Sequence, residues 1–267
     1  MLFRSWHKIL YDLGYVSTKE PFARLVNQGL ILGEDNRKMS KSFGNVVNPD
    51  EVVNEYGTDS MRLFEMFMGP LEDTKPWSMK GVEGVHRFLN RVWRMMVDEN
   101  GSLDPSIRDA EMTADQERLL HQTVKKVTAD IEALAFNTAI SQMMIFVNEF
   151  LSPEVKPRAA MEIFTLLLSP FAPHIAEELW QKLGHTHTLA YEAWPQYDES
   201  KMIIENVEMV VQVNGKVRSK FSVPVNMEEE ELKKIVLTDQ AVKRHLDGKQ
   251  IVKMVVVKNR LVSIVVK

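Results

Sequence analysis

The sequence predicts a multidomain protein in which an all-α helical bundle is followed by a small α+β domain. Two observations carry this prediction. Apolar residues recur at helical spacing from about residue 81 to residue 184, in roughly five segments joined by short connections. Beyond residue 200 the pattern changes to strand-like runs around Asn214-Gly215, a strong β-hairpin signature.

The composition is that of an ordinary globular protein. Its 267 residues are 45% hydrophobic and 26% charged, enough for one or two well-buried domains and a small third. No apolar run reaches the length of a bilayer span and no signal peptide opens the chain, so we expect no membrane partner and a cytoplasmic location. The chain has no cysteine, which excludes disulfides and cysteine-ligated zinc.

Charge is distributed unevenly along the chain. Residues 201–267 carry 13 Lys and Arg against 8 Asp and Glu, a local charge of +5. Because the whole chain carries −4, the first 200 residues carry −9. A basic tail on an acidic body favours a polyanionic partner for the tail, although on charge alone a solvated surface is the simpler interpretation.

The first 80 residues mix helices with a short strand region. Apolar spacing predicts a helix over residues 2–13, and the run RLVNQGLILGED predicts a short buried strand that ends in a turn. Asn48 can cap a following helix that starts at Pro49. A second helix follows directly, for which Thr58 or Asp59 is the expected cap.

The helical region has clear start and stop residues. Thr113, followed by Gln116 three positions later, predicts a capping box at the start of one helix. Pro170 and Pro173 divide the last long helical run into two helices. The methionine-rich run SQMMIFVNEF is expected to fill the core, and Trp180 is expected to pack in the bundle.

The tail reads as a hairpin, a helix and a second hairpin. The acids Glu228 to Glu231 fall in the first turn of the expected helix, where the helix dipole favours them, and the second hairpin turns near Asn259. Lys216, Arg218 and Lys220 alternate along one expected strand, so we expect them to share a face that contacts RNA phosphates and sugars.

The run Lys38-Met39-Ser40-Lys41-Ser42 is the strongest candidate for a site of chemistry. Two lysines flanked by hydroxyls can place phosphates and neutralise the charge that grows when an adenylyl or phosphoryl group is transferred. The glycines of a Walker phosphate loop are absent, which argues against a P-loop kinase or GTPase. For two lysines alone, a basic surface loop would be the preferred interpretation.

The complete run, followed by Gly44-Asn45, resembles the second signature of class I aminoacyl-tRNA synthetases. The helix pair NPDEVVNEYGTDSMRLF resembles the stem-contact segment of that family, and FAPHIAEELWQKLGH resembles the end of its anticodon-binding bundle. The resemblance implies the end of an α/β Rossmann-like catalytic domain at 1–47, a stem-contact segment at 48–80, a helical bundle at 81–200 and a tRNA-binding α+β domain at 201–267.

Within the family, RSWHKILYDLG and VVQVNGKVRSK look like the bacterial leucine-specific branch. The isoleucine and valine branches stay open as alternatives, although their usual cysteine zinc site or coiled-coil arm has no counterpart here. The resemblance implies ATP with Mg²⁺, leucine and the tRNA for leucine as partners, a monomer, and no structural metal. It makes Lys41 the main catalytic phosphate contact, with Lys38 assisting and Met39, Ser40 and Ser42 completing the ATP-binding loop.

Two departures from the family pattern matter. Phe43 stands where the family often has Lys or Arg, so an auxiliary phosphate contact is in doubt there. The first family signature, a His-x-Gly-His turn, is absent, so we expect the chain to begin partway through the catalytic domain and to be inactive alone. A non-catalytic RNA-binding protein is therefore the alternative function.

Two further groups of residues are candidate sites. Arg87, Arg91 and Arg94 lie at three- and four-residue steps beside Trp93, which predicts one helix face that either contacts RNA or is simply solvated. His185 and His187 form a His-x-His pair, but no third ligand lies near them in sequence. We therefore expect no metal site.

Overall fold

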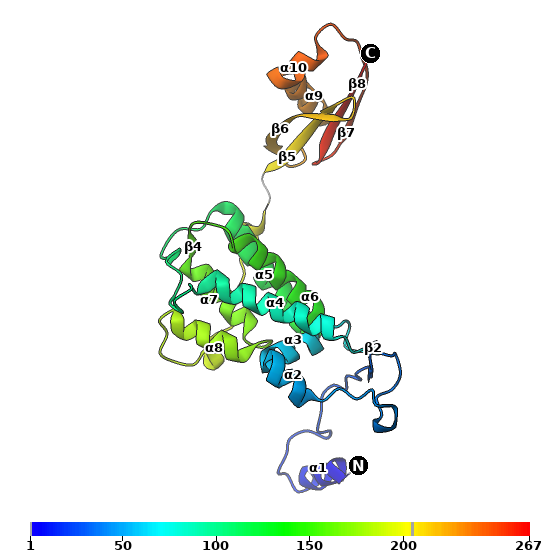
Figure 1. The fold of residues 1–267 in the computed structure, drawn as a ribbon, viewed down its shortest axis with the longest axis vertical. Coiled ribbons are helices and arrows are strands. Elements are labelled where there is room, and N and C mark those ends of the chain that lie inside the picture. The colour runs from blue at the N-terminus through cyan, green and yellow to red at the C-terminus, as the bar shows by residue number, and fades with distance from the viewer. Residues whose placement is uncertain (1, 204–205) are drawn as a thin grey trace. The chain divides into compact units, whose positions relative to one another are not determined.

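The structure is a computed structural model that describes residues 2–203 and 206–267. It divides the chain into two compact units, Met1–Lys201 and Met202–Lys267 (Figure 1). The first unit is mainly helical and the second is a four-stranded sheet with two helices. Each unit has its own buried apolar cluster.

The first unit holds the longer helices. Its main elements are α1 (Leu2–Asp12), β1 (Ile31–Leu32), the 3₁₀ turn η1 (Lys41–Phe43), α2 (Pro49–Tyr56), α3 (Thr58–Phe67), β2 (Lys75–Pro76), α4 (Met79–Met96), β3 (Ile107–Arg108), α5 (Ala114–Glu132), α6 (Phe136–Phe150), β4 (Lys156–Pro157), α7 (Arg158–Leu168) and α8 (Pro173–Lys182). The two 3₁₀ turns η2 (Leu189–Tyr191) and η3 (Glu199–Met202) follow. The five helices expected between residues 81 and 184 are confirmed as α4 to α8.

One apolar core joins α2 to α8. Its centre is a stack of three phenylalanines from α6 and α7, in which the Phe146 ring lies 4.2 Å from Phe150 and 4.7 Å from Phe164 between centroids. Met143 is fully buried in the same cluster, which confirms that the methionine-rich run fills the core. Stacked rings and buried methionines contribute both apolar burial and dispersion contacts, so this core fixes the relative positions of the helices.

The capping box at the start of α5 is confirmed. Thr113 Oγ1 accepts a hydrogen bond from the Gln116 amide at 3.3 Å, and Gln116 Oε1 accepts one from the Thr113 amide at 3.0 Å. The predicted caps of α3 are wrong, because Gly57 is its N-cap residue and forms no side-chain cap. The reason is that Asp59 points to another helix.

Asp59 caps α8 across the bundle. Its side chain is 11% exposed and accepts hydrogen bonds from the Ile175 amide at 2.8 Å, the His174 amide at 3.4 Å and His174 Nδ1 at 2.8 Å. The N-cap residue of α8, Ala172, has no side-chain acceptor of its own. A carboxylate from α3 therefore satisfies the free amides at the positive end of α8 and ties the two helices together.

The apolar side of α1 is largely uncovered. Trp6 is 61% exposed and Leu13 65% exposed, although the spacing of the apolar residues is that of an amphipathic helix. Phe3 contacts Phe22 edge-to-face at 5.6 Å, and Arg4 pairs with Glu20 at 3.1 Å. The segment after α1 thus folds back on the helix without burying its apolar face.

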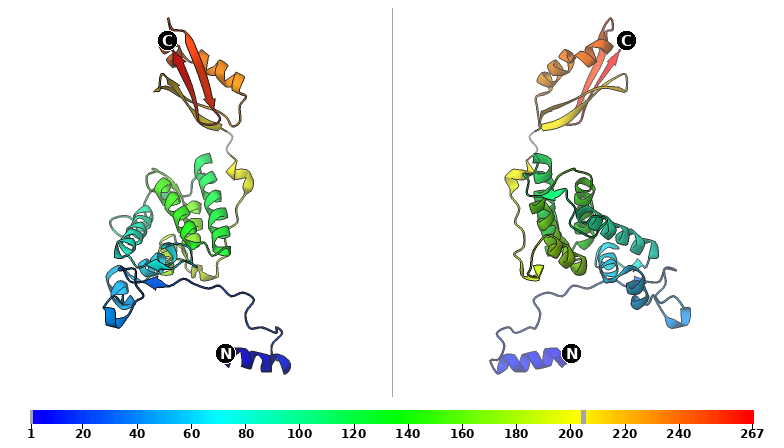
Figure 2. Two further views of the ribbon diagram at one scale, coloured as in Figure 1. Left: turned by 90° about the vertical axis from the view of Figure 1, so that its right-hand side faces the viewer. Right: turned by 60° about the vertical axis from the view of Figure 1, so that its left-hand side comes forward.

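The second unit packs two helices on one face of a sheet (Figure 2). Its elements are β5 (Asn206–Val213), β6 (Lys216–Pro224), α9 (Glu229–Thr238), α10 (Gln240–Leu246), β7 (Ile251–Val257) and β8 (Leu261–Val266). Both predicted hairpins are confirmed, with Asn214 and Asn259 at positive φ in the turns. The strand order is β6-β5-β8-β7, and β5 and β8 are parallel. The sequence did not predict α10.

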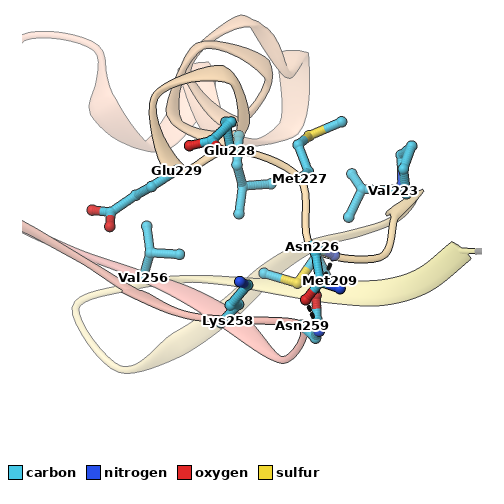
Figure 3. A pocket seen from close by; sticks show the side chains of 11 residues that line it. Met209, Val223, Asn226, Met227, Glu228, Glu229, Val256, Lys258 and Asn259 are labelled. Atoms are coloured by element: carbon cyan, nitrogen blue, oxygen red, sulfur yellow. Dashed lines mark hydrogen bonds between the residues drawn. The ribbon is translucent and has the colours of Figure 1, made fainter.

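Two asparagines join the loops at one end of this sheet. The Asn226 amide donates to Asn259 Oδ1 at 2.9 Å, and Asn259 Nδ2 donates to Asn226 Oδ1 at 3.3 Å (Figure 3). These bonds tie the start of α9 to the β7–β8 turn beside a hollow of about 200 Å³ lined by Met209, Met227 and others. The second hairpin is thereby fixed relative to α9.

A β-bulge in β6 overturns the expected common face of Lys216, Arg218 and Lys220. Ser219 pairs with Val211 and Val217 pairs with Gln212, so Arg218 is the extra residue. Directly paired residues share a face. Lys216 pairs with the buried Val213, on the helix-covered face, whereas Lys220 pairs with Val210 on the other. One inserted residue reverses the alternation, and the expectation was therefore wrong.

Replacing Asp59 should test the cross-helix cap. Asp59→Ala should lower the free energy of unfolding of the first unit by about 2 kcal/mol, because three donors lose a largely buried charged acceptor. Urea unfolding followed by tryptophan fluorescence reports this unit alone, since all five tryptophans lie before residue 202. Asp109→Ala, which removes a carboxylate 91% exposed and paired with Arg158, is the matched control and should cost less than about 1 kcal/mol. Equal midpoints for the two variants would contradict the capping role.

Candidate phosphate-binding loop and nucleic-acid interface

The candidate phosphate loop, residues 38–42, directly follows a tight turn after β1. Leu32 and Lys38 form an antiparallel bridge, and the Gly33 amide donates to the Arg37 carbonyl at 2.8 Å. Asn36 takes a positive φ of 63° at the tip of this turn, a conformation that asparagine tolerates better than most residues. The chain therefore reverses direction just before Lys38, so Lys38 lies beside Leu32 of β1.

Asn45 closes the loop as a central hydrogen-bonding residue. Its Oδ1 accepts from the Ser40 amide at 2.8 Å, while its Nδ2 donates to Asp35 Oδ1 at 3.1 Å and to the Lys38 carbonyl at 3.3 Å. Hydrogen bonds donated by the Asn45 side chain and by the Arg37 amide hold the pKa of the Asp35 carboxyl below its usual value. Asp35 is therefore charged at neutral pH, and the stability that its charged hydrogen bonds contribute decreases only as the pH falls through this lowered pKa.

The two lysines of the loop are exposed, and among the described residues neither forms an ion pair. Between them, Ser40 caps the short turn η1, and its Oγ lies 2.8 Å from Ser42 Oγ. Gly44 ends the turn at a positive φ of 64°. The loop thus presents two free ammonium groups and a hydroxyl pair from a defined backbone, an arrangement suited to phosphate oxygens.

The loop is anchored to the helical bundle at its base. Met39 and Val47 pack against the main apolar core. Glu34 Oε1 accepts a hydrogen bond from the Met79 amide at 2.9 Å, at the start of α4. This packing explains why the apolar Met39 stands between two lysines: its side chain lies against the core, whereas Lys38 and Lys41 are exposed.

Phe43, the residue that departs from the family pattern, is 63% exposed. The guanidinium of Arg37 lies 5.9 Å from its ring centroid, within the range of a cation–π contact. The contact joins the turn before the lysines to the turn after them. Arg37 supplies a positive charge close to the position where the family often has one.

The three arginines of α4 gather at one hollow of about 410 Å³, together with Asn90 and Trp93. Arg91 donates to Asn148 Oδ1 at 2.6 Å, and Arg94 Nε donates to the Asn90 carbonyl at 3.3 Å. The ammonium group of Lys182 lies over the Trp93 ring, 5.4 Å from its centroid, in a cation–π contact. The structure therefore brings Arg87, Arg91 and Arg94 together as the spacing predicted.

A second hollow next to this one was missed by the sequence analysis. It has a volume of about 460 Å³ and shares Asn90 and Trp93 with the arginine hollow. Its other walls include Tyr56, His86 and His174, which come from three different helices. His86 Nδ1 lies 3.1 Å from Ser60 Oγ and from the Tyr56 carbonyl. No sequence pattern links these residues, because the packing of α2, α4 and α8 brings them together.

His185, one member of the candidate metal pair, has other contacts. His185 Nε2 lies 3.0 Å from Glu162 Oε1, and its ring stacks on Trp180 at 3.6 Å between centroids. Over residues 2–203 and 206–267, no group of three or more His, Asp or Glu side chains is placed to hold a metal ion. In the same ranges no helix combines the length and the apolar character that crossing a membrane requires.

Removing the amide of Asn45 should release the loop. In Asn45→Ala the Ser40 amide and the Asp35 carboxylate lose their partner, so loop opening should rise about fivefold, the equivalent of roughly 1 kcal/mol for a net hydrogen bond. The rate of limited trypsin cleavage after Lys38 and Lys41 measures this opening. NMR titration should show the Asp35 pKa returning toward its usual value. Asn54→Ala, which changes an exposed asparagine on α2, is the control. Equal cleavage rates in both variants would show that Asn45 does not hold the loop closed.

Comparison with known proteins gives matches over nearly the whole chain. The family profile described as tRNA synthetases class I (I, L, M and V) matches residues 3–75, and that of the anticodon-binding domain of tRNA ligase matches residues 117–235. The Leucine--tRNA ligases of two strains of Leptospira biflexa serovar Patoc are 57% identical over 264 residues. The alignment covers 98% of this chain and 30% of each relative, so the chain spans about a third of their length.

A solved structure is similar as well. It is described as the ternary complex of Agrobacterium radiobacter K84 agnB2 LeuRS with tRNA and LeuAMS, and it matches 99% of this chain and 36% of its own chain with a TM-score of 0.62 and 32% identity. The chain is therefore a homologue of a C-terminal part of the leucine–tRNA ligases, and its residues 3–75 match the class I tRNA synthetase profile.

Proposed function

We propose that this chain is the part of a leucine–tRNA ligase that carries the second class I signature and the tRNA-binding domains. The parent enzyme would join the carboxylate of leucine to the α-phosphorus of ATP, releasing pyrophosphate and forming leucyl-adenylate. It would then transfer the leucyl group to the 3′ end of its tRNA, releasing AMP. The 57% identity to the Leptospira ligases is the observation that favours leucine over isoleucine or valine.

The geometry of the loop supports the adenylation role. Lys38 and Lys41 are exposed, while Asn45 and Met39 fix the backbone between and around them. Lys41 is our choice for the main contact to the phosphates in the transition state, with Lys38 assisting. The hydroxyls of Ser40 and Ser42 complete the ATP-binding loop. The ammonium groups would neutralise charge on the leaving pyrophosphate, which lowers the barrier only if the contact strengthens as the reaction proceeds.

Mg²⁺ enters this proposal as part of the nucleotide substrate. Bound to the phosphates, it would neutralise part of their negative charge beside the two lysines. The described residues near the loop offer cationic and hydroxyl groups toward the nucleotide, together with Asp35, which is already engaged with Asn45. The chain's own contribution is therefore to position and neutralise the phosphates.

Transfer RNA is the proposed partner of the remaining parts. Arg87, Arg91 and Arg94 beside Trp93 would contact phosphates on the bundle, and the basic second unit would make further contacts through Lys216, Arg218 and Lys220. Lys220 is 2.9 Å from Glu208 and would have to exchange that exposed partner for a phosphate. The proposal includes a stem-contact role for residues 48–80, a monomer and a cytoplasmic location.

A non-catalytic RNA-binding protein is the second candidate, and a specific observation favours it for the isolated chain. The loop is present without the His-x-Gly-His turn that the family uses to hold ATP. The chain alone should therefore bind tRNA and fail to exchange pyrophosphate into ATP. The two candidate functions are distinguished by measuring ATP–pyrophosphate exchange with this chain as part of its parent protein. An enzyme part should support exchange there, and a non-catalytic RNA-binding protein should not.

Lys41→Ala in the intact enzyme tests the adenylation role. The rate of ATP–pyrophosphate exchange should fall by about a hundredfold or more, with much smaller changes in the KM values for ATP and leucine, because the lost contact forms mainly in the transition state. Lys234→Ala, an exposed lysine of α9, is the matched control and should leave exchange unchanged. An unchanged exchange rate in Lys41→Ala would remove this lysine from the proposed site.

Salt dependence tests the tRNA-binding role of the chain alone. Binding measured by filter retention should weaken steeply between low and physiological salt, because phosphate contacts release counterions. In the double variant Arg87→Gln/Arg94→Gln, the salt slope should fall by about 1 to 2, roughly one for each lost contact. Asp109→Ala serves as the control for handling and stability. An unaltered slope in the double variant would exclude this face of α4 from the interface.

A further inference from the structure

The hollow of about 460 Å³ that His86 and His174 line is called the histidine hollow below. It lies within the first unit, between the helix pair α2–α3 and the helices α4 and α8. Most of its lining residues lie before residue 117, where the match to the anticodon-binding profile begins. The profile match therefore gives this hollow no role of its own.

The hydrogen bonds of His86 place a proton on one nitrogen of its ring. Nδ1 lies 3.1 Å from the Tyr56 carbonyl oxygen and 3.1 Å from Ser60 Oγ. A carbonyl oxygen can only accept, so Nδ1 carries a proton and donates it. In the neutral ring Nε2 is then a hydrogen-bond acceptor, and it has no partner among the described residues. His86 therefore brings one free acceptor to the hollow.

His174 is held in the same way, by a carboxylate from α3. Its Nδ1 lies 2.8 Å from Asp59 Oδ1, and its side chain is 72% exposed whereas that of Asp59 is 11% exposed. The carboxylate accepts, so Nδ1 is again the donor and Nε2 of the neutral ring is an acceptor. In the described part of the chain this Nε2 also has no partner. A second free acceptor is thus held in place at a surface that a ligand can reach.

Helix packing accounts for only one nitrogen of each ring. The Nδ1 contacts join α4 to α2 and α3, and α8 to α3. These contacts do not require that the second nitrogen of both rings be a free acceptor, or that both rings line one hollow. Two acceptors with fixed tautomers suit a ligand that presents an amino group.

The remaining walls suit a flat ring that is attached to a negative charge. Leu89 and Ile175 add apolar surface, and Trp93 stands at the border with the arginine hollow. The three arginines of α4 line that neighbouring hollow. Proteins hold unstacked nucleotides with this combination, in which the base lies against aromatic or apolar side chains and basic groups contact the backbone phosphates.

We propose that the histidine hollow takes one unpaired adenine or cytosine of bound tRNA, while the arginines of α4 hold the phosphate of that nucleotide. The inference rests on the proposed tRNA-binding function and adds a base contact to its phosphate contacts. The amino group of the base would donate to Nε2 of His86 and of His174. At the same position guanine and uracil present a carbonyl oxygen, which would face two acceptors and gain no hydrogen bond.

NMR of the histidine side-chain nitrogens in the full chain tests which base is bound. Spectra are recorded at about pH 8, where an ordinary histidine ring is neutral, with AMP, CMP, GMP, UMP or inorganic phosphate. AMP and CMP should shift the Nε2 signals of His86 and His174, which are assigned by their loss in His86→Asn and His174→Asn. GMP, UMP and inorganic phosphate should shift them much less. Equal shifts with all five would overturn the assignment of an amino-bearing base.

The double variant His86→Asn/His174→Asn removes both acceptors and keeps the contacts between helices. The amide nitrogen of asparagine is bonded to Cγ, as Nδ1 is, so it can still donate to the Tyr56 carbonyl and to Asp59. The tRNA affinity should fall about fivefold or more, as for the loss of a base contact. The salt slope of binding should stay the same, because no phosphate contact is lost.

His187→Asn is the matched control, because it makes the same exchange at an exposed histidine outside both hollows. Its tRNA affinity and its urea midpoint should equal those of the unaltered chain. His174→Asn alone, at an exposed position, should lower the affinity about twofold or more with an unchanged midpoint, which keeps the test valid if the double variant is destabilised.

The outcomes separate the hollow from the broader proposal. If tRNA binds and both His174→Asn and the double variant equal the control, the base site is overturned while tRNA binding stands. If the affinity falls together with the salt slope, the histidines act on phosphate and the base site is again overturned. If AMP shifts the two histidines but the chain does not bind tRNA, the hollow stands as a nucleotide site and the tRNA-binding proposal fails.

Discussion

The apolar core shared by α2 to α8 is the constraint on which the rest of the first unit depends. The phenylalanine stack of α6 and α7 fills its centre, and the neighbouring helices pack around it. Because a close-packed core resists local displacement, every residue attached to these helices inherits a defined position. The Asp59 cap on α8 adds a polar fastening to the same assembly.

The candidate loop depends on this core although none of its functional atoms belongs to it. Met39 packs on the core and Glu34 binds the start of α4, so the lysines on either side of Met39 are held relative to the bundle. The arginines of α4 lie on a helix whose other side is buried in the same core. A rigid frame thus carries both the loop proposed for phosphate groups and the arginine surface proposed for a polyanion.

Much of the fold follows from short stretches of sequence. The capping box at Thr113, the prolines between α7 and α8, and the Asn214-Gly215 turn each act over a few residues, so their outcome does not depend on distant partners. The lysine loop was likewise recognisable from five consecutive residues. Helix α10 was missed because its seven residues carry too few apolar positions to establish a period.

The sequence by itself determined the helices of the bundle, the two hairpins and the family signature, because these are set by local backbone preference and by residue order. Only the tertiary structure decided what Asp59 caps, which residues meet His86 and His174, and which residue of β6 forms the bulge. Each of these depends on contacts between elements far apart in the chain. The bulge shows the reason most clearly: a single extra residue reverses the side-chain alternation of β6, and it is fixed by pairing with β5 and packing against α10.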